Sequence, residues 1–260
     1  MTGDVVMDLR ERQNTIQARH PWELSRARAL KTILTKEIPG RQGFNVLDIG
    51  CGDGYTVAAV CKDAPLARID AIDIHLSETQ LAELPRQEPR VHFHNSYDSL
   101  ASRVYNTILL LDVVEHVEDD IGFLREITKK YTAPGCHVLI TAPAFAGLFS
   151  SHDRFLGHHR RYRLAQLEQL TQAAGLTCRS SGYLFSSLLP LRYISLQLER
   201  LFKKGAPENK GIGSWNHGVV ITRMVESILN IDNLILLYLN RRLGVKLPGL
   251  TVWALCEKQP

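Results

Sequence analysis

The stretch from Asn45 to Gly54 constrains the fold more than any other part of this sequence. Its first half is apolar around Asp48 and predicts a buried strand of a parallel sheet. Three glycines follow at alternate positions and let the backbone turn tightly and approach a ligand closely: Gly50, Gly52 and Gly54. The residues from Tyr55 onward suit a helix start, whose free N–H groups would face the same ligand. The stretch therefore predicts a strand, a turn and a helix beside a bound small molecule.

Two acids strengthen this prediction. Asp48 ends the strand, where its carboxylate can face a bound ammonium group. A second apolar run, residues 67–72, ends in Asp73. This is about twenty residues on, where an acid binds ribose in doubly wound nucleotide-binding folds.

The VLDIGCGDG stretch together with Asp73 resembles the first motif pair of class I S-adenosylmethionine (SAM)-dependent methyltransferases. The resemblance covers about residues 20–184 and implies SAM as the cofactor. In such proteins an aspartate after the third strand usually holds the adenine, whereas here Ser96 and Tyr97 stand near that place and Asp98 comes later. The residues expected to contact SAM are Asp48, Gly50, Cys51, Gly52, Asp73, Ile74, Ser96, Tyr97 and Asp112.

Strand-like and helix-like stretches alternate along the chain, which predicts right-handed βαβ units. We expect an α/β fold with a doubly wound, mostly parallel seven-stranded sheet and helices on both faces. The resemblance alone makes the last strand antiparallel. The expected strands are 45–49, 67–73, 91–94, 106–113, 136–142, 177–184 and 251–257. The expected helices are 21–37, 55–62, 77–84, 115–131, 164–174, 185–202 and 219–239.

The length and composition predict one domain over residues 1–260, because 260 residues with 45% hydrophobic content can bury a large core. A helical cap is expected at 1–43 and a helical insertion at 185–248. The insertion has broad apolar helix faces, with Lys203-Lys204 and Arg241-Arg242 at the helix ends. An accessory core layer, a substrate lid, a homodimer surface and a membrane-surface patch all remain open for it.

Charge and cysteine content point to a cytoplasmic protein. The formal net charge of +4 is too small to indicate nucleic acid, and the five scattered cysteines are typical of reduced thiols. The first thirty residues do not have the pattern of a signal peptide. No apolar run reaches the ~18 residues that cross a bilayer, so membrane association would be peripheral.

The loops after the fourth and fifth strands should line the reaction site, because ligands of open parallel sheets bind at the carboxyl ends of the strands. Methyl transfer to an alcohol needs a base, and His116 is placed for that role because imidazole titrates near neutral pH. Glu115 and His152 are further catalytic candidates. The DVVEHV segment resembles the same segment in ubiquinone-type O-methyltransferases. A structural or helix-capping role for His116 is the alternative.

A metal site is a second possibility in the same loops. Asp112, Glu115 and His116 have the spacing that places three ligands on one helical face, and His152 or His158 could complete the set. Small-RNA 2′-O-methyltransferases hold a divalent metal with a similar string, but the string is also common in metal-free relatives. We expect no metal.

The SHDRFLGHHRRY segment carries the candidate acceptor-binding residues. Arginine suits a carboxylate or a phosphate, so the segment predicts a clamp for an anionic group. The alternative is a solvated basic loop with one arginine paired to Asp153 or Glu168. The sequence of this segment resembles that of a bacterial methyltransferase group found with sugar- and lipid-modifying enzymes. The acceptor candidates are His158, Arg160, Arg161, Tyr162 and Trp22, of which Trp22 could instead pack its helix on the sheet.

Together these features favour a SAM-dependent methyltransferase that acts on a hydroxyl of a small-molecule, glycosylated or lipid-linked acceptor. A SAM-binding scaffold or sensor without turnover is the alternative from another class. A metal-assisted RNA 2′-O-methyltransferase is less favoured, because the sequence has no long basic face. A SAM-dependent cyclase on the same fold is a further alternative.

Overall fold

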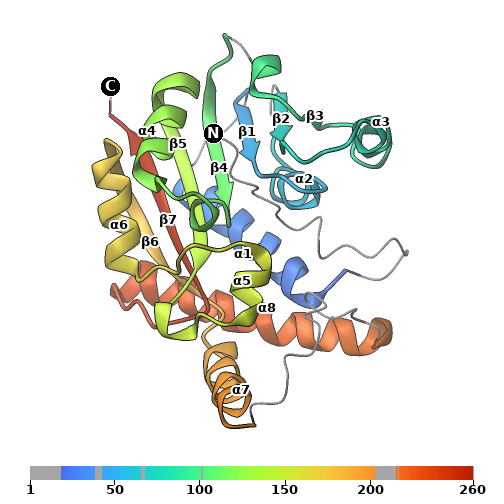
Figure 1. The fold of residues 1–260 in the computed structure, drawn as a ribbon. Helices are drawn as coiled ribbons and strands as arrows, with labels where there is room; N and C mark the ends of the chain where they lie inside the picture. The colour runs from blue at the N-terminus through green and yellow to red at the C-terminus, as the bar shows by residue number, and fades with distance from the viewer. Residues whose placement is uncertain are drawn as a thin grey trace.

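The computed structural model describes residues 19–38, 43–65, 68–100, 102–202, 215 and 217–259. Within these residues, seven strands form one sheet in the order β3-β2-β1-β4-β5-β7-β6 (Figure 1). The strands are β1 Asn45–Ile49, β2 Arg68–Ile72, β3 His92–His94, β4 Tyr105–Leu111, β5 Thr132–Pro143, β6 Leu176–Leu184 and β7 Thr251–Lys258. β7 pairs antiparallel with β5 and β6, and the remaining pairs are parallel. The predicted doubly wound, mostly parallel sheet is confirmed.

Helices cover both faces of the sheet (Figure 1). One buried apolar cluster joins the sheet to α4 and α6, and the other joins it to α1, α2 and α8. This division explains why β4 is buried along nearly its whole length, since helices cover a central strand on both sides. The helices are α1 Pro21–Glu37, α2 Tyr55–Val60, α3 Glu78–Gln87, α4 Asp120–Tyr131, α5 Ser151–Leu156, α6 Leu164–Ala173, α7 Leu188–Phe202 and α8 Gly218–Leu243.

The region after β4 differs from the expected helix over 115–131. β4 ends at Leu111, and Asp112 takes a left-handed conformation with φ of 60°. A single 3₁₀ turn, η3 (Val114–His116), follows. α4 begins only after Asp119, whose side chain accepts a hydrogen bond from the Gly122 N–H at 2.9 Å. Asp112, Glu115 and His116 therefore do not share one helical face, because the backbone turns between them.

The segment between β6 and β7 contains the two expected helices, and α8 lies along α1. Asn233 of α8 is buried, accepts from the Phe185 N–H at 2.9 Å and donates to Ser25 of α1 at 3.1 Å. α7 extends from the lower end of the molecule (Figure 1), and Leu196 is the buried member of its described side chains. In the described part of the chain, every helix is too short or too polar to span a bilayer. The expectations for residues 1–18 and for Lys203-Lys204 lie outside the described residues.

Candidate functional site

The glycine turn after β1 has the conformation that its sequence predicts. Gly50, Gly52 and Gly54 all have positive φ, at 70°, 54° and 75°. A Cβ on Gly54 would lie 2.5 Å from the Phe93 ring of β3, so this position requires glycine for space as well as for conformation. The turn is therefore fixed by its own backbone and by a neighbouring strand.

Several amides of this turn are hydrogen-bonded within the chain. The Gly50 and Cys51 N–H groups donate to the Ile72 carbonyl at 2.8 and 3.2 Å. The Gly54 N–H donates to the Cys51 carbonyl at 2.9 Å, and the Tyr55 N–H donates to Asp53 at 3.0 Å. Of the helix-start amides expected to face a ligand, the Tyr55 N–H is thus engaged with the Asp53 side chain.

Carboxylates surround the turn. Asp73 is buried, and its two oxygens accept hydrogen bonds from the Gly52 N–H at 3.2 Å and the His75 N–H at 3.0 Å. Asp48 is also buried, at the end of β1. Burial, reinforced by the Asp48 and Asp73 charges, raises the pKa of the Cys51 thiol well above its usual range. The turn therefore lies in a negative environment, which suits a positively charged ligand.

The residues after β2 and β3 offer an apolar surface beside these acids. Ile74 directly follows Asp73 and is half exposed. Tyr97 stacks on Tyr131 with ring centroids 6.0 Å apart, and burial raises the pKa of its phenol. Ser96 is exposed, and its hydroxyl accepts from the Asp98 N–H at 3.2 Å. Ile74 therefore offers an exposed apolar side chain at the position after Asp73.

Asp112 is held by a residue that the sequence did not single out. Arg26 of α1 lies 2.7 Å from the Asp112 carboxylate and donates to the Thr141 hydroxyl of β5 at 3.0 Å. Thr141 in turn donates to Asp112 at 2.9 Å. Arg26 lies 5.2 Å from the Trp22 ring, which itself contacts Phe185 at 5.8 Å. Trp22, a predicted acceptor-binding residue, thus contacts Arg26 of its own helix and Phe185, which directly follows β6.

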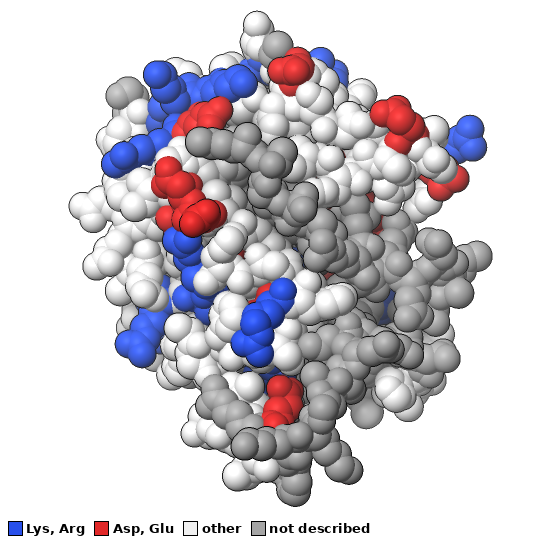
Figure 2. Space-filling view, viewed as in Figure 1, with Lys and Arg blue, Asp and Glu red and all other residues white. Residues whose placement is uncertain are grey.

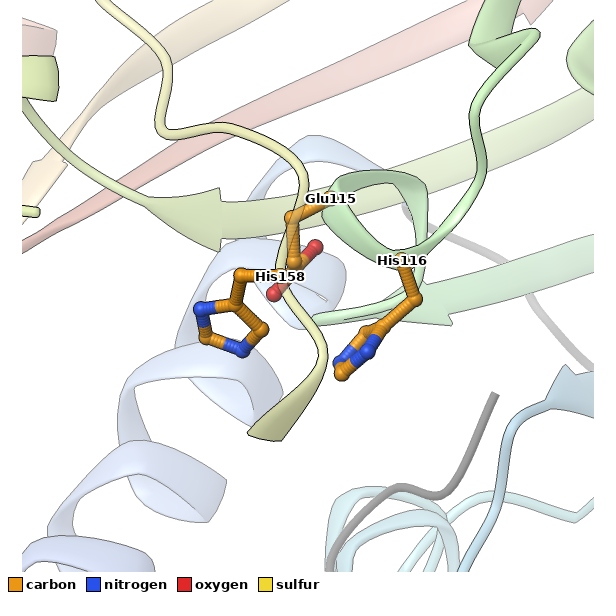
Figure 3. Close-up of side chains that lie close together, drawn as sticks. All are labelled: Glu115, His116 and His158. Carbon is orange, nitrogen blue, oxygen red and sulfur yellow. The ribbon is translucent and has the colours of Figure 1, made fainter. Parts of the chain in front are cut away.

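Glu115, His116 and His158 gather at the ends of β4 and β5, and Figure 3 shows the Glu115 carboxylate between the two imidazoles. One ligand atom from each lies within 4.8 Å of the others. The two imidazole rings meet edge to face at 4.7 Å. Both oxygens of Glu115 are buried without a hydrogen-bond partner. Burial, and then the nearby Asp112 charge, raise the pKa of Glu115 well above its usual range.

This cluster differs from the predicted ligand set. His158 belongs to it, whereas the Asp112 carboxylate is engaged with Arg26 and Thr141. His152 lies on α5 and is half-buried, and burial lowers its pKa. The observed ligand cluster differs from the predicted one because the backbone turns at Asp112. The helical spacing of the sequence does not indicate this turn.

Asp153 organises the loop that carries His158. Asp153 is fully buried and accepts from the Ser150 N–H at 2.8 Å and from Arg161 Nε at 2.6 Å. Its other close partner is His158 Nδ1, at 2.9 Å. Burial alone would raise the pKa of Asp153, but hydrogen bonds from His158 and Arg161 hold it well below its usual range. The ionised carboxylate therefore fixes the orientation of His158.

The candidate acceptor residues Arg160, Arg161 and Tyr162 are engaged within the chain. Arg161 binds Asp153, and Arg160 donates to Asp120 at 3.0 Å and to the Glu118 carbonyl at 2.6 Å. The buried Tyr162 hydroxyl donates to Asp120 at 2.7 Å. These contacts hold the loop against η3 and α4. The three side chains therefore do not form the open anion clamp that the sequence predicts. They match the alternative of an arginine paired with Asp153.

Sequence reasoning missed two positioning residues, Arg26 and Ser150. Arg26 gave no signal, because its partners are distant in the sequence. Ser150 did give one, because a serine three residues before Asp153 has the spacing of a helix N-terminal capping box. This spacing would also have predicted α5.

Comparisons with known proteins agree with this geometry. A family model described as a methyltransferase domain matches residues 17–181. Norajmaline N-methyltransferase of Rauvolfia serpentina is 26% identical over 152 residues, which are 55% of this chain and 50% of that protein. The chain spans about half the length of the curated relatives it matches.

Solved structures share the fold at low sequence identity. The cyclase SpnF has a TM-score of 0.56 and 17% identity, over 95% of this chain and 85% of that one. The plantazolicin methyltransferase BpumL, in complex with a monoazolic desmethylPZN analog and S-adenosylhomocysteine (SAH), has a TM-score of 0.52 and 16% identity. That match covers 92% of this chain and 85% of BpumL. At these identities the likeness concerns the fold alone.

Proposed function

This chain belongs to the methyltransferase domain family, and from that premise we propose that it binds SAM and transfers its methyl group to a hydroxyl. The acceptor is a small-molecule, glycosylated or lipid-linked alcohol. The observation that carries this proposal is the buried His116 beside His158, at the carboxyl end of β4. The same edge of the sheet carries the glycine turn.

SAM would lie over the glycine turn with its positive groups toward the acids. Asp48 would meet the ammonium group, and Asp73 would accept hydrogen bonds from the ribose hydroxyls. Both carboxylates are buried beside Gly50 and Gly52, so their charges are weakly screened. Ile74 would cover one face of the adenine with its exposed side chain.

His116 would act as the general base. The acceptor oxygen attacks the methyl carbon in line, the carbon–sulfur bond breaks, and SAH leaves as a neutral thioether. The imidazole of His116 takes the hydroxyl proton as the carbon–oxygen bond forms. His158, oriented by Asp153, packs against this imidazole and limits its rotation. The enzyme otherwise contributes mainly by holding the two reactants in contact.

The His116→Gln variant tests this proposal. The purified chain is incubated with methyl-labelled SAM and an extract of the source cells, and the labelled product is identified by mass spectrometry. We expect the rate of labelling to fall about a hundredfold or more, while SAH affinity in calorimetry changes little. His92→Gln, at an exposed histidine of β3, is the matched control and should keep the rate.

The other outcomes separate the alternatives. An unchanged rate in His116→Gln would remove His116 as the base. SAH binding without labelling of any extract fraction would favour a scaffold or sensor. Label on nitrogen would replace the hydroxyl acceptor by an amine, and label in RNA would favour the 2′-O-methyltransferase alternative.

A second candidate is metal-assisted transfer, favoured by the unpartnered Glu115 oxygens beside two imidazoles. One carboxylate oxygen and two imidazole nitrogens suit Zn²⁺ or Mn²⁺. Glu115, His116 and His158 would hold the ion, which would supply Lewis-acid activation of the acceptor hydroxyl. Elemental analysis of protein purified without chelator, and labelling after EDTA treatment, decide this. A metal-free protein with an unchanged rate removes the candidate.

A further inference from the structure

The exposed faces of α7 and α8 are apolar over most of their length. On α8, the residues at alternating three- and four-residue spacing are about half exposed: Ile221, Met224, Ile228, Ile231, Ile235 and Tyr238. α7 carries a similar exposed row: Leu191, Ile194, Leu198 and Leu201. Soluble monomers rarely expose contiguous apolar patches beyond a few hundred Å², and larger ones mark interaction sites. We call the two rows together the α7–α8 face.

The opposite side of α8 already has its partners. Leu229, Asn233 and Leu236 are buried against α1 and the sheet. With 26 residues, α8 is about 39 Å long at ~1.5 Å per residue. The α7–α8 face is therefore a long surface in addition to the core-facing side of the helix.

The exposed charges of α8 have one sign, whereas α7 carries the half-exposed Glu199 beside the less exposed Arg192. The exposed charged side chains of α8 are Arg223, Arg241 and Arg242. The two acids of α8 are engaged elsewhere: Glu226 is buried beside Arg28 at 2.9 Å, and Asp232 accepts from the Ser187 N–H at 3.0 Å. In Figure 2 the described side chains at the lower end of the molecule are mostly uncharged, with blue and red groups both present near them.

This charge pattern disfavours pairing of α8 with a second copy of the chain. A parallel pair of α8 helices would bring each arginine beside the same arginine of the other molecule. An antiparallel pair centred on Ile231 would place Arg223 within about one turn of Arg241 of the other copy. Either arrangement juxtaposes like charges with no exposed acid on α8 to compensate, which is unfavourable. An anionic surface complements the same pattern.

We propose that the α7–α8 face binds the surface of an anionic lipid bilayer. The isoleucine and leucine side chains enter the acyl boundary, and Arg223, Arg241 and Arg242 contact lipid phosphates from the rim. The reaction site is connected to this face, because Arg192 of α7 donates to the Ser150 hydroxyl at 2.6 Å, next to Asp153. The inference concerns peripheral binding and holds whatever group is methylated.

Flotation of the full-length protein with vesicles tests this. One vesicle type is phosphatidylcholine alone, and the other also contains phosphatidylglycerol. We expect binding to the anionic vesicles, weaker binding to the neutral ones, and release by salt. Arg241→Gln combined with Arg242→Gln should weaken anionic binding about tenfold or more. Arg86→Gln, at an exposed arginine of α3, is the matched charge control and should bind normally.

The apolar contribution has two independent tests. Ile231→Glu with Ile235→Glu changes α8, and Ile194→Glu with Leu198→Glu changes α7. Each pair should reduce vesicle binding at least about tenfold. Val104→Glu, at an equally exposed valine before β4, should have no effect. Thermal melting confirms that each variant is folded, as expected for exposed positions.

Three results would overturn the proposal. One is no binding to anionic vesicles. Another is binding that neither apolar pair reduces or that is equal for both vesicle types. The third is a lipid-free dimer by light scattering that Ile231→Glu with Ile235→Glu dissociates, because the face would then serve self-association.

Discussion

At the scale of single residues, Gly54 meets two requirements that no other residue type meets together. Its backbone has φ of 75°, and its α-carbon faces the Phe93 ring without room for a Cβ. Gly43 has the same φ, but a Cβ added there would meet no atom within 4 Å, and Gly147 has neither constraint. Replacing each of the three glycines by alanine therefore separates two destabilising effects: the cost of a left-handed backbone and the cost of a steric clash.

We expect Gly54→Ala to lower the free energy of unfolding by about 2 kcal/mol or more, since a left-handed alanine costs roughly 1–2 kcal/mol before the ring must move. Gly43→Ala should cost about 1 kcal/mol, and Gly147→Ala should stay within ~0.5 kcal/mol. Urea unfolding measures all three. If Gly54→Ala is as mild as Gly43→Ala, the Phe93 contact does not constrain the turn.

Single residues also show where sequence reasoning leaves a choice. The basic loop offered Asp153 or Glu168 as the partner of an arginine. Arg161 binds Asp153, while Glu168 accepts from Ser181 at 2.5 Å and from Lys246 at 3.2 Å. Asp153 and Glu168 both lie within a few residues of the basic loop in the sequence. Only the path of the chain after β5 therefore decides which of them pairs with an arginine.

At the scale of elements, α1 does more than cover the sheet. It carries Arg26 to Asp112 and Thr141, and so connects the first helix to the ends of β4 and β5. Arg28, two residues later, forms an ion pair with Glu226 of α8 but is itself two-thirds exposed. The same helix thus holds a buried and an exposed arginine, each with a carboxylate partner.

We expect Arg26→Ala to lower the free energy of unfolding by about 2 kcal/mol or more, because it leaves the Asp112 charge without its buried partner. Arg28→Ala should cost at most about 1 kcal/mol, since its side chain is well solvated. Chemical denaturation of both variants provides the comparison. Equal losses would show that the Arg26 pair contributes no more than a surface ion pair.

The break between β4 and α4 explains the main error at this scale. Apolar residues continue at helical spacing through Val117, Ile121 and Leu124, so the pattern predicts one helix. Of these, Leu124 is buried, whereas Ile121 is more than one-third exposed and Val117 precedes α4. The left-handed Asp112 and the Asp119 cap interrupt this predicted helix. The chain between them forms the η3 turn, and α4 begins only after Asp119.

At the scale of the whole molecule, buried acids make the fold sensitive to low pH. Asp70 of β2 is fully buried and accepts from His94 of β3 and from Tyr105 of β4. Burial would raise its pKa, but these bonds and the Arg68 charge hold the pKa well below its usual range. Asp153 is shifted in the same direction.

The sign of the effect follows from these shifts. An acid whose folded pKa lies below its unfolded value of ~3.9 stabilises the fold above that pH and loses this contribution as the pH falls further. We expect the free energy of unfolding to fall on acidification below pH ~5. The Asp70→Asn variant should be less stable near neutral pH, and its free energy of unfolding should fall less steeply on acidification. Denaturation across pH measures both, and exposed Asp98→Asn should follow the unmodified protein. An acid branch for Asp70→Asn as steep as that of the unmodified protein would contradict the assignment.

The sequence by itself determined the sheet class, the glycine turn with Asp48 and Asp73, and membership of the class I SAM-dependent methyltransferases, which the family match confirms. These features depend on residues close together in the chain, where backbone conformation and burial are set locally. Only the tertiary structure decided that His158 joins Glu115 and His116, that Arg26 holds Asp112, and which face of α8 stays uncovered. Such contacts join residues far apart in sequence, so they exist only once the strands are in register and the loops after β4 and β5 meet.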